Sequence, residues 1–268
     1  MKTNDAARPL HMVQLQLDAA ALMRQVRDLN LGQRHEDLGY PVHAALAALF
    51  GQGTVQPFSI RGEARHQGVG SKPVVLGYSA QDRKALTEHA ETYADPGFYQ
   101  ACEWPSLACK PMPRRWNAGR VLGFEVRICP VVRLASDLST GQPAGGPRTY
   151  KKGSEMDVWL NRRLRDPQNG DVSISRQQAY RDWLQQRLGQ VARLQSALLR
   201  RFRRVNLVRR KQDSERTART LERPEAVLTG SLEILDPQGF SRLLAGGVGR
   251  HKAFGFGMLL LRAGSRDA

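Results

Sequence analysis

Segments typical of short strands and helices follow one another in the same order twice along this chain, and this repeated order constrains the fold most. In the first half, alternating apolar and polar residues predict a strand at Met12–Leu17. A helical region, two strands, a helix and a last strand are predicted after it. They are helical stretches to about Asp28 and from Tyr40 to Phe50, strands at Val55–Arg61 and Pro73–Tyr78, a helix at Ser79–Tyr93 with Ser79 as N-cap, and a strand within Trp104–Met112. This β-α-β-β-α-β order predicts a ferredoxin-like unit.

The second half repeats the order around a longer insertion. Its predicted elements are a strand at Val121–Leu134, a helix that Ser175 caps and Gly189 ends, a hairpin arm within Arg200–Lys211 with its loop at Gln212–Thr217, a strand at Ala226–Leu235, a helix at Pro237–Ala245 and a strand at Met258–Arg262. We therefore predict an α+β protein with two tandem ferredoxin-like (RRM-like) domains, each built on a β-α-β-β-α-β antiparallel sheet.

Composition indicates where these domains begin and end. The segment Pro111–Gly119 is rich in Pro and Arg and lacks periodicity, so it is the predicted linker. We expect an N-terminal extension at 1–11, an N-terminal domain at 12–115 and a basic C-terminal domain at 120–268. Within the C-terminal domain, residues 136–172 form the predicted insertion, with a short helical piece around Asp157–Leu164.

Positive charge is concentrated in the second half of the chain. The 268 residues contain 41 Lys and Arg against 25 Asp and Glu, a net charge of +16. Residues 1–119 contain 13 basic and 11 acidic side chains, whereas residues 120–268 contain 28 and 14. A folded protein with such a basic half favours a polyanion, usually nucleic acid, as its partner. The longest apolar runs are far too short to span a bilayer, so a membrane protein is not expected.

Cysteine usage bears on the compartment and on cofactors. The three cysteines, Cys102, Cys109 and Cys129, form no CxxC pair, so neither a disulfide framework nor a thiolate zinc site is expected. The first eleven residues lack the apolar core of a signal peptide. We expect a cytoplasmic protein in a reducing compartment that uses no metal and no small-molecule cofactor.

An arginine-rich run is the first candidate for binding a polyanion. The segment RRFRRVNLVRRK, Arg200–Lys211, has seven cations in twelve residues and no acidic residue. A solvated helix face is the usual explanation of a charge run, but such faces normally mix signs. Contact with RNA phosphates explains the run better. The predicted RNA-binding residues are Arg200, Arg201, Arg203, Arg204, Arg209, Arg210 and Lys211.

A glycine-rich loop at Gly246–Gly257, GGVGRHKAFGFG, is the second candidate. Glycines let a backbone approach a phosphate closely, and cations between them add charge. The segment is neither a P-loop nor a dinucleotide fingerprint, because it follows a helix and precedes a strand. An ordinary glycine-rich turn is the alternative. The residues predicted to contact the RNA backbone are Gly247, Gly249, Arg250, His251 and Lys252.

Tyr40 and His43 are the candidates for chemistry. They stand three residues apart, on one face of a predicted helix whose next residues are mostly alanine. Metal-free cleavage of RNA needs a general base for the 2′-hydroxyl, a general acid for the departing 5′-oxygen and cations for the phosphorane, and a histidine can take either proton role. The spacing alone also fits a histidine at the helix surface or in the core.

The chain resembles the CRISPR-associated repeat-processing endoribonucleases, in particular the CasE type of the type I-E systems. The resemblance is strongest over Pro224–Arg262, with its strand, "DP" helix start, glycine-rich loop and last strand in order. Gly123–Ala135 resembles the family's first C-terminal strand, and Ala179–Gly189 resembles its helix. The family implies two ferredoxin-like domains that bind a CRISPR repeat hairpin, cut at its 3′ base by 2′-hydroxyl attack without metal, and stay bound to the guide RNA within a class 1 effector complex such as Cascade.

The resemblance also implies residue roles. The family's Tyr-x-x-His motif falls on Tyr40 and His43 as catalytic residues, and its basic hairpin falls on Arg200–Lys211. The lysine that some members have five residues after the histidine would stand at Ala48, so charge stabilisation must come from elsewhere. The candidates for that charge are Arg250, Lys252 and Arg61. This departure keeps a non-catalytic RNA-hairpin-binding subunit open as the alternative; a metabolic enzyme with a small phosphate ligand would explain neither the basic half nor the arginine run.

Overall fold

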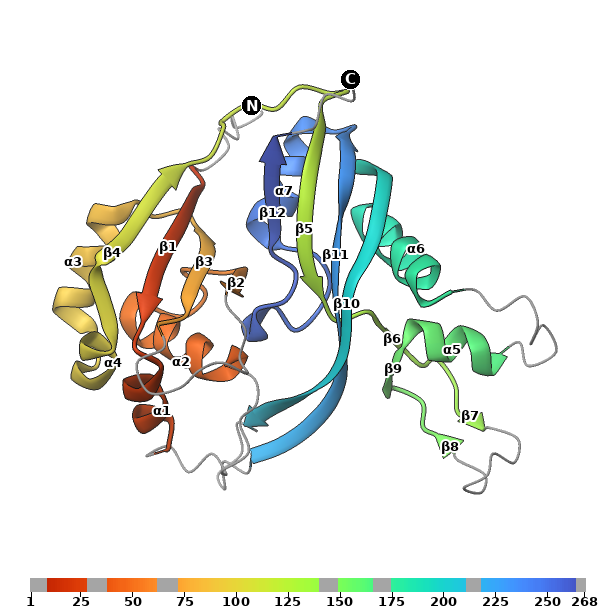
Figure 1. The fold of residues 1–268 in the computed structure, drawn as a ribbon, viewed down its shortest axis with the longest axis horizontal. Coiled ribbons are helices and arrows are strands. Elements are labelled where there is room, and N and C mark those ends of the chain that lie inside the picture. The colour runs from red at the N-terminus through yellow and green to blue at the C-terminus, as the bar shows by residue number, and fades with distance from the viewer. Residues whose placement is uncertain are drawn as a thin grey trace, which may run out of the picture.

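The computed structural model describes residues 9–27, 38–61, 72–139, 149–165, 175–210 and 218–263, and for residues 27, 208–210, 218 and 219 it describes the backbone alone. Two four-stranded antiparallel sheets organise these residues, one in each half of the chain (Figure 1). The predicted extension at 1–11 therefore lies mostly outside the described residues. No helix among the described residues is long and apolar enough to cross a membrane.

The first sheet and its helices form what we call the N-terminal unit. Its elements are β1 (His11–Leu17), α1 (Ala19–Arg27), α2 (Gly39–Phe50), β2 (Phe58–Arg61), β3 (Val74–Ser79), α3 (Arg83–Tyr93), α4 (Pro96–Gln100) and β4 (Cys102–Pro111). The strand order is β2-β3-β1-β4, and all neighbours are antiparallel. Val13, Leu15 and Leu17 alternate into the core beneath the helices, as the predicted strand requires.

Two details of the N-terminal unit differ from the predictions. Asp82, not Ser79, caps α3: its carboxylate accepts a hydrogen bond of 2.9 Å from the Ala85 amide, while Ser79 ends β3. The short helix α4 was not predicted. Asp95 caps it through the amides of Gly97 and Phe98, and Pro96 occupies its first turn.

The second sheet belongs to the C-terminal unit. Its elements are β5 (Val121–Ile128), α6 (Arg176–Leu188), β10 (Ala192–Arg210), β11 (Ala218–Ile234), α7 (Pro237–Gly246), the 3₁₀ turn η3 (Lys252–Phe254) and β12 (Leu259–Ala263). The order β10-β11-β5-β12 repeats the order of the first sheet. The prediction of two tandem ferredoxin-like folds is confirmed.

The helix α6 begins and ends as its sequence predicts. The Ser175 hydroxyl accepts a hydrogen bond of 3.1 Å from the Gln178 amide, and Gly189 ends the helix with a positive φ of 56°. Tyr180 and Trp183 on α6 are fully buried against β5, whose Phe124 and Val126 face the same core. The intervening residues of β5 therefore point to the opposite face of the sheet.

The predicted strand at Val121–Leu134 is wrong in its second half. β5 ends at Ile128, and the chain leaves the sheet at Cys129-Pro130, because proline has no amide hydrogen to continue the ladder. Small elements follow in the insertion: β6 (Val131–Arg133), β7 (Leu138–Ser139), β8 (Thr149–Tyr150), β9 (Glu155–Asp157) and α5 (Val158–Arg165). β6 pairs with β9, and β7 pairs with β8.

The predicted linker runs between β4 and β5 without a helix or strand, but it is fixed to the C-terminal unit. Trp116 is buried and packs edge-on against Phe240, with 5.2 Å between the ring centroids. The Gly119 amide donates a hydrogen bond of 2.8 Å to the Ile234 carbonyl. The domain limits at 12–115 and 120–268 stay a prediction.

The two units contact each other through their sheets and through α2. The Tyr78 hydroxyl on β3 donates a buried hydrogen bond of 2.8 Å to the Leu259 carbonyl on β12. The 3₁₀ turn η3 and the strand β10 both pack against α2. In Figure 1, β10 and β11 continue as a long ribbon well past the ends of β5 and β12. The glycine-rich loop and the basic hairpin thus meet the helix that carries Tyr40 and His43.

Candidate nucleic-acid interface

Helix α2 places Tyr40 and His43 on its partly buried side. Val42, Leu46 and Leu49 on the same helix are buried in the N-terminal core, so the helix is firmly held. Neither Tyr40 nor His43 makes a hydrogen bond with another described residue. Burial lowers the pKa of His43 from its ordinary value of 6.5. The imidazole is therefore mainly neutral at pH 7, and no described residue forms a hydrogen bond with its nitrogens.

Backbone conformation and packing explain why glycine occupies positions 247 and 249, the two glycines predicted to contact RNA. Gly247 ends α7 with a φ of 69°, and a β-carbon there would lie 2.9 Å from Pro57 of the other unit. Gly249 has a φ of 77°, and a β-carbon there would lie 2.6 Å from the Trp183 ring. Both positions require glycine because of backbone conformation and close neighbours. Their role in contacting RNA phosphates stays a prediction.

Two polar residues of the loop, Arg250 and His251, bind to a carboxylate from the insertion. Glu155 on β9 lies 2.8 Å from His251 Nε2 and 2.8 Å from Arg250 Nε, and Arg223 of β11 donates to it at 3.0 Å. The hydrogen bond with His251 lowers the pKa of Glu155 to about 2, against the opposing effect of burial. Lys252 instead donates a hydrogen bond of 2.6 Å to the Gly246 carbonyl.

The arginine run forms one arm of the long hairpin, as predicted, and its first half is paired with acidic residues. Arg203 donates to both carboxylate oxygens of Glu225 at 2.8 Å and 3.0 Å, and Arg201 donates at 3.1 Å. Arg204 pairs with Glu222 at 2.8 Å. The run contains no acid, but the antiparallel partner β11 supplies two, so self-repulsion of the run is smaller than its sequence indicates.

Among the remaining members of the run, Arg200 alone has a described side chain. The Arg200 Nε donates a hydrogen bond of 2.9 Å to the Thr229 hydroxyl. The backbone of Arg209 and Arg210 belongs to β10, whereas their side chains and Lys211 lie outside the described residues. The predicted contacts of the run with RNA stay predictions.

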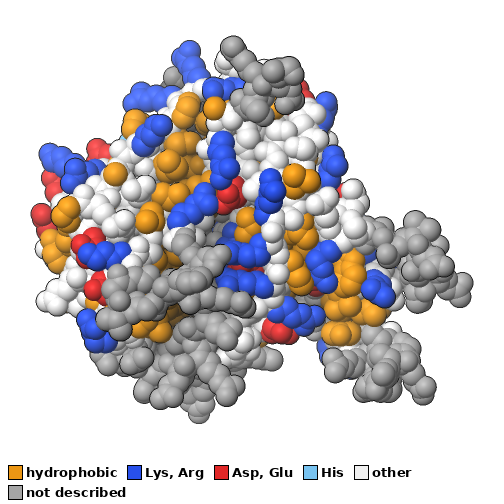
Figure 2. All heavy atoms as spheres, viewed as in Figure 1, with side chains coloured by type: hydrophobic (Ala, Val, Ile, Leu, Met, Phe, Trp, Pro, Cys, Tyr) orange, Lys and Arg blue, Asp and Glu red, His pale blue; other side chains and the backbone are white. Residues whose placement is uncertain are grey.

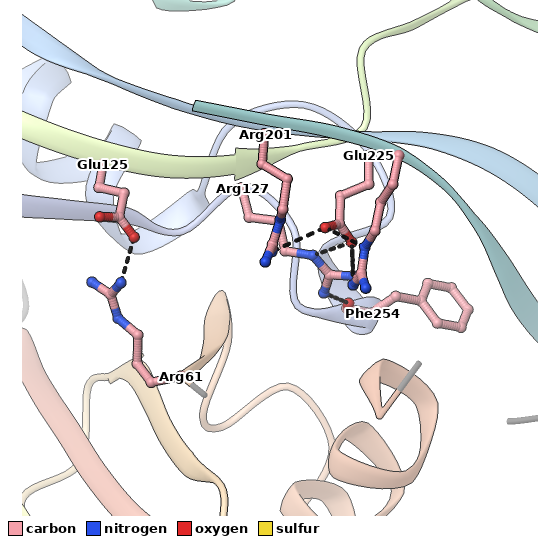
Figure 3. A network of polar contacts seen from close by, with 7 residues as sticks. Arg61, Glu125, Arg127, Arg201, Glu225 and Phe254 are labelled. Atoms are coloured by element: carbon pink, nitrogen blue, oxygen red, sulfur yellow. Dashed lines mark hydrogen bonds and ion pairs between the residues drawn. The ribbon is translucent and has the colours of Figure 1, made fainter. Parts of the chain in front are cut away.

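Glu225 is the centre of a cluster that joins β5, β10 and the glycine-rich loop (Figure 3). Its side chain is fully buried, and Arg127 donates to it through Nε at 2.9 Å. The Nη1 of Arg127 donates to the Phe254 carbonyl at 3.0 Å, and its guanidinium lies 4.1 Å from the Phe256 ring centroid. Burial by itself raises the pKa of Glu225, but the charges and hydrogen bonds of Arg127 and Arg203 outweigh it, and the pKa is lowered.

A second acidic residue on the same sheet face bridges the two units. Glu125 of β5 forms ion pairs with Arg61 of β2 and with Arg262 of β12. Figure 3 shows Arg61 reaching from the N-terminal unit to Glu125. Figure 2 shows Lys and Arg side chains gathered along the middle of this view, between the two halves, with few acidic ones among them. On this face, positive charge therefore exceeds negative charge between the two units.

Each cation proposed as a substitute for the missing lysine already has a partner. Ala48 lies partly buried on α2. Arg250 pairs with Glu155, Lys252 with the Gly246 carbonyl and Arg61 with Glu125. Arg201 and Arg203 belong to β10, the strand that packs against α2. Arg201 in particular keeps 46% of its side chain exposed, so it is open to an anion.

Sequence reasoning missed Glu155, Glu225 and Arg127. The available signal at Glu225 was a charged residue at the start of an apolar stretch, AVL, where a buried strand was predicted. Such a residue indicates a buried ion pair. Its partners could not be named, because they come from positions 98 residues earlier and 22 residues earlier in the sequence. Among the described residues there is no group of three or more His, Cys, Asp or Glu side chains arranged to hold a metal ion.

Replacing Glu225 by Gln should destabilise the fold, because Arg127, Arg201 and Arg203 lose their shared negative charge in a buried place. We expect a loss of about 3 kcal/mol in the free energy of unfolding near pH 7, measured by urea denaturation. The folded-state pKa of Glu225 is lowered, so its contribution is present above the unfolded-state pKa of 4.5 and disappears as the pH falls through the folded-state pKa.

The difference between wild type and Glu225→Gln should accordingly shrink as the pH is lowered below about 4. Glu222→Gln is the matched control, because Glu222 lies on the same strand and pairs with Arg204 while both side chains are more than half exposed. We expect that variant to change stability by less than about 1 kcal/mol. Equal losses from the two variants would contradict a special role of the buried carboxylate.

Comparison with known proteins places the chain in a family. The family described as CRISPR-associated protein matches residues 10–263. The CRISPR-associated endoribonuclease Cse3 of Thermus thermophilus is 30% identical over 176 residues, which cover 66% of this chain and 69% of that protein. The solved structure of Cse3 bound to 19 nt RNA has a TM-score of 0.57 at 20% identity, over 94% of this chain and 99% of that one. A chain of a CRISPR RNA-guided surveillance complex has a TM-score of 0.53 at 15% identity, over 94% and 99%. These structures share the fold, and the family match over nearly the whole length shows that this chain belongs to the CRISPR-associated proteins.

Proposed function

We propose that this protein is an endoribonuclease that binds CRISPR precursor RNA and cleaves it within the repeat, at the 3′ base of the hairpin. The observation that carries the proposal is the packing of η3 and β10 of the basic unit against α2, the helix with Tyr40 and His43. The helix that carries the imidazole thus packs against a strand that is rich in arginine. The relative from Thermus thermophilus is named as an endoribonuclease, and the solved structure of a Cse3 bound to RNA, which shares the fold, supports the same substrate class.

The proposed chemistry uses the RNA's own 2′-hydroxyl as nucleophile. The 2′-oxygen loses its proton and bonds to the adjacent phosphorus, and the bond from phosphorus to the 5′-oxygen breaks. The departing 5′-oxygen takes up a proton from water, so the products are a 2′,3′-cyclic phosphate and a 5′-hydroxyl. Because burial lowers the pKa of His43, its neutral imidazole can accept the 2′-hydroxyl proton. Tyr40 lies one turn before it and can donate a hydrogen bond to the phosphate. Arg201 and Arg203 are two of the cations on β10, which packs against this helix, and we propose that they stabilise the charge.

The proposed RNA contacts fall on the hairpin and the glycine-rich loop. An A-form stem is held mainly through its phosphates and its shape, which suits a long twisted ribbon with outward arginines. Arg200 and Arg204 are exposed, and Arg250 on the loop keeps about half of its side chain exposed. A protein that holds its product hairpin in this way can remain on the guide RNA as a subunit of a class 1 CRISPR complex.

A non-catalytic RNA-hairpin-binding subunit is the second candidate, and one observation favours it. Ala48 occupies the position at which some members have a lysine, so the cation of their site is absent from α2. Both candidates bind the hairpin, but only an endoribonuclease cuts it.

Cleavage of a labelled repeat hairpin should proceed in EDTA and leave a 2′,3′-cyclic phosphate, because the nucleophile is the neighbouring 2′-hydroxyl. A substrate with a single 2′-deoxy nucleotide at the cleavage position should bind equally well and stay intact. Gel analysis with end-group determination by mass spectrometry checks both points. Cleavage of the deoxy substrate would refute the mechanism, and binding without any cleavage of the all-RNA substrate would favour the non-catalytic candidate.

His43→Ala should slow single-turnover cleavage by roughly 100- to 10,000-fold, the usual loss for a general acid or base, with little change in RNA affinity. Tyr40→Phe should cost less. For a base whose pKa lies below 6.5, the logarithm of the wild-type rate should rise with pH and level off by about pH 7. A rate that falls across pH 5 to 7 would instead make His43 the general acid, and an unchanged rate in His43→Ala would remove it from the site.

Replacing Arg204, Arg209 and Arg210 together by Ala should weaken hairpin binding and lower the salt slope of the affinity by roughly one unit for each phosphate that is no longer neutralised. Arg203 is left in place because it holds Glu225. The matched control replaces Arg24, Arg27 and Lys84 of the nearly neutral first half. Fluorescence anisotropy at several salt concentrations measures both triples. Equal losses in the two would show that the hairpin arginines are an ordinary solvated surface.

A further inference from the structure

A carboxylate of the insertion between β5 and α6 binds polar side chains of the glycine-rich loop, beside the apolar cluster that contains Val131 and Phe256. Glu155, at the start of β9, has a side chain that is 11% exposed and binds three groups, two guanidinium groups and one imidazole. Two of these groups, Arg250 and His251, are neighbours in the loop, and the third, Arg223, comes from β11. A residue that lies 96 positions away in the sequence therefore helps to hold the loop in place.

The strand β9, which carries Glu155, is held by contacts with α6. Two residues further on, Asp157 accepts hydrogen bonds from Arg176 at 2.7 Å and from the Tyr180 hydroxyl at 2.9 Å, both on α6. The Arg176 guanidinium in turn lies between two rings, 4.0 Å from the centroid of Trp159 on α5 and 3.8 Å from that of Phe202 on β10. The strand β9 is thus attached to α6 and to the hairpin.

The loop at the other end of Glu155 is under conformational constraint. His251 has a φ of 61°, and it is the one non-glycine residue with a positive φ among the described residues. Such a conformation persists where surrounding contacts hold it, and it concentrates at functional sites. The hydrogen bond from His251 Nε2 to Glu155 is one such contact. The residues directly after His251 form η3, which packs against α2.

We propose that Glu155 is a positioning residue for RNA cleavage: it holds Arg250 and His251 so that the glycine-rich loop keeps its place against the helix of His43. This inference rests on the proposed function and assigns the insertion a role in it. Glu155 itself does not touch the RNA. Its carboxylate determines where two polar side chains of the loop stand relative to α2.

The charge of Glu155 separates this role from a purely structural one. The carboxylate neutralises part of the positive charge of Arg223 and Arg250. Glu155→Gln keeps the shape and removes the negative charge, so the surface becomes more attractive to a polyanion. A positioning role therefore predicts slower cleavage together with unchanged or tighter RNA binding. A variant that merely unfolds part of the protein would lose both.

The test measures the single-turnover rate, RNA affinity and melting temperature of Glu155→Gln on the repeat hairpin. A misplacement of about 1 Å can cost roughly 100-fold in rate, so we expect a loss of roughly 10- to 100-fold in cleavage. Asp137→Asn is the matched control, because Asp137 lies in the same insertion and pairs with Lys151 at the exposed surface. That variant should behave as wild type. Wild-type cleavage by Glu155→Gln would overturn the proposal, whereas a wild-type protein that does not cleave would overturn the proposed function instead.

A double-mutant cycle with His251→Gln keeps the proposal falsifiable if Glu155→Gln is less stable. If Glu155 acts through His251, the double variant should cleave no more slowly than the slower single variant. Independent losses that multiply in the double variant would show that Glu155 does not act through this histidine, and would refute the positioning role as stated.

Discussion

The neutralisation of Glu225 by three arginines holds the basic half of this protein together. The carboxylate is fully buried, and Arg127, Arg201 and Arg203 reach it from β5 and β10. Without it, three guanidinium groups would lie close together in a place that water cannot screen well. With it, the sheet face opposite the helices can be polar and still compact. The Arg127 guanidinium also binds the Phe254 carbonyl, so the same cluster fixes one end of the glycine-rich loop.

Three carboxylates form ion pairs that fix the side chains of a strongly cationic surface. Glu225 serves the hairpin, Glu125 joins the two units through Arg61, and Glu155 binds the loop through Arg250 and His251. Each one binds more than one cationic group, so positive charge remains in excess around it. A surface of this kind keeps its attraction for a polyanion while its side chains stay ordered. Arg201 and Arg250 thus stabilise the fold through ion pairs while about half of each side chain stays exposed.

The helix α2 connects this cationic surface to the proposed reaction, because it carries Tyr40 and His43 and contacts the basic unit. The helix belongs to the nearly neutral N-terminal unit, and on its own it carries only a histidine and a tyrosine. The basic unit supplies the cations, because η3 and β10 pack against it. In the reaction we propose, acid–base chemistry and charge stabilisation therefore come from different halves of the chain. The interface between the halves, with the Tyr78 hydrogen bond to the Leu259 carbonyl and the Arg61 ion pair with Glu125, holds the two contributions in register.

The sequence by itself determined the order of elements, because apolar periodicity, caps and turn residues act over a few neighbouring positions. The strand at β1, the capped helix α6, the hairpin and the family resemblance at Pro224–Arg262 all followed from such local patterns. The break of the sheet at Pro130 and the cap at Asp82 needed the structure, since a local pattern allows more than one boundary. The pairing of Glu225 with Arg127 and of Glu155 with His251 was decided only by the tertiary structure. Such partners depend on strand register and on the packing of an insertion, and no local rule relates residues that lie almost a hundred positions apart.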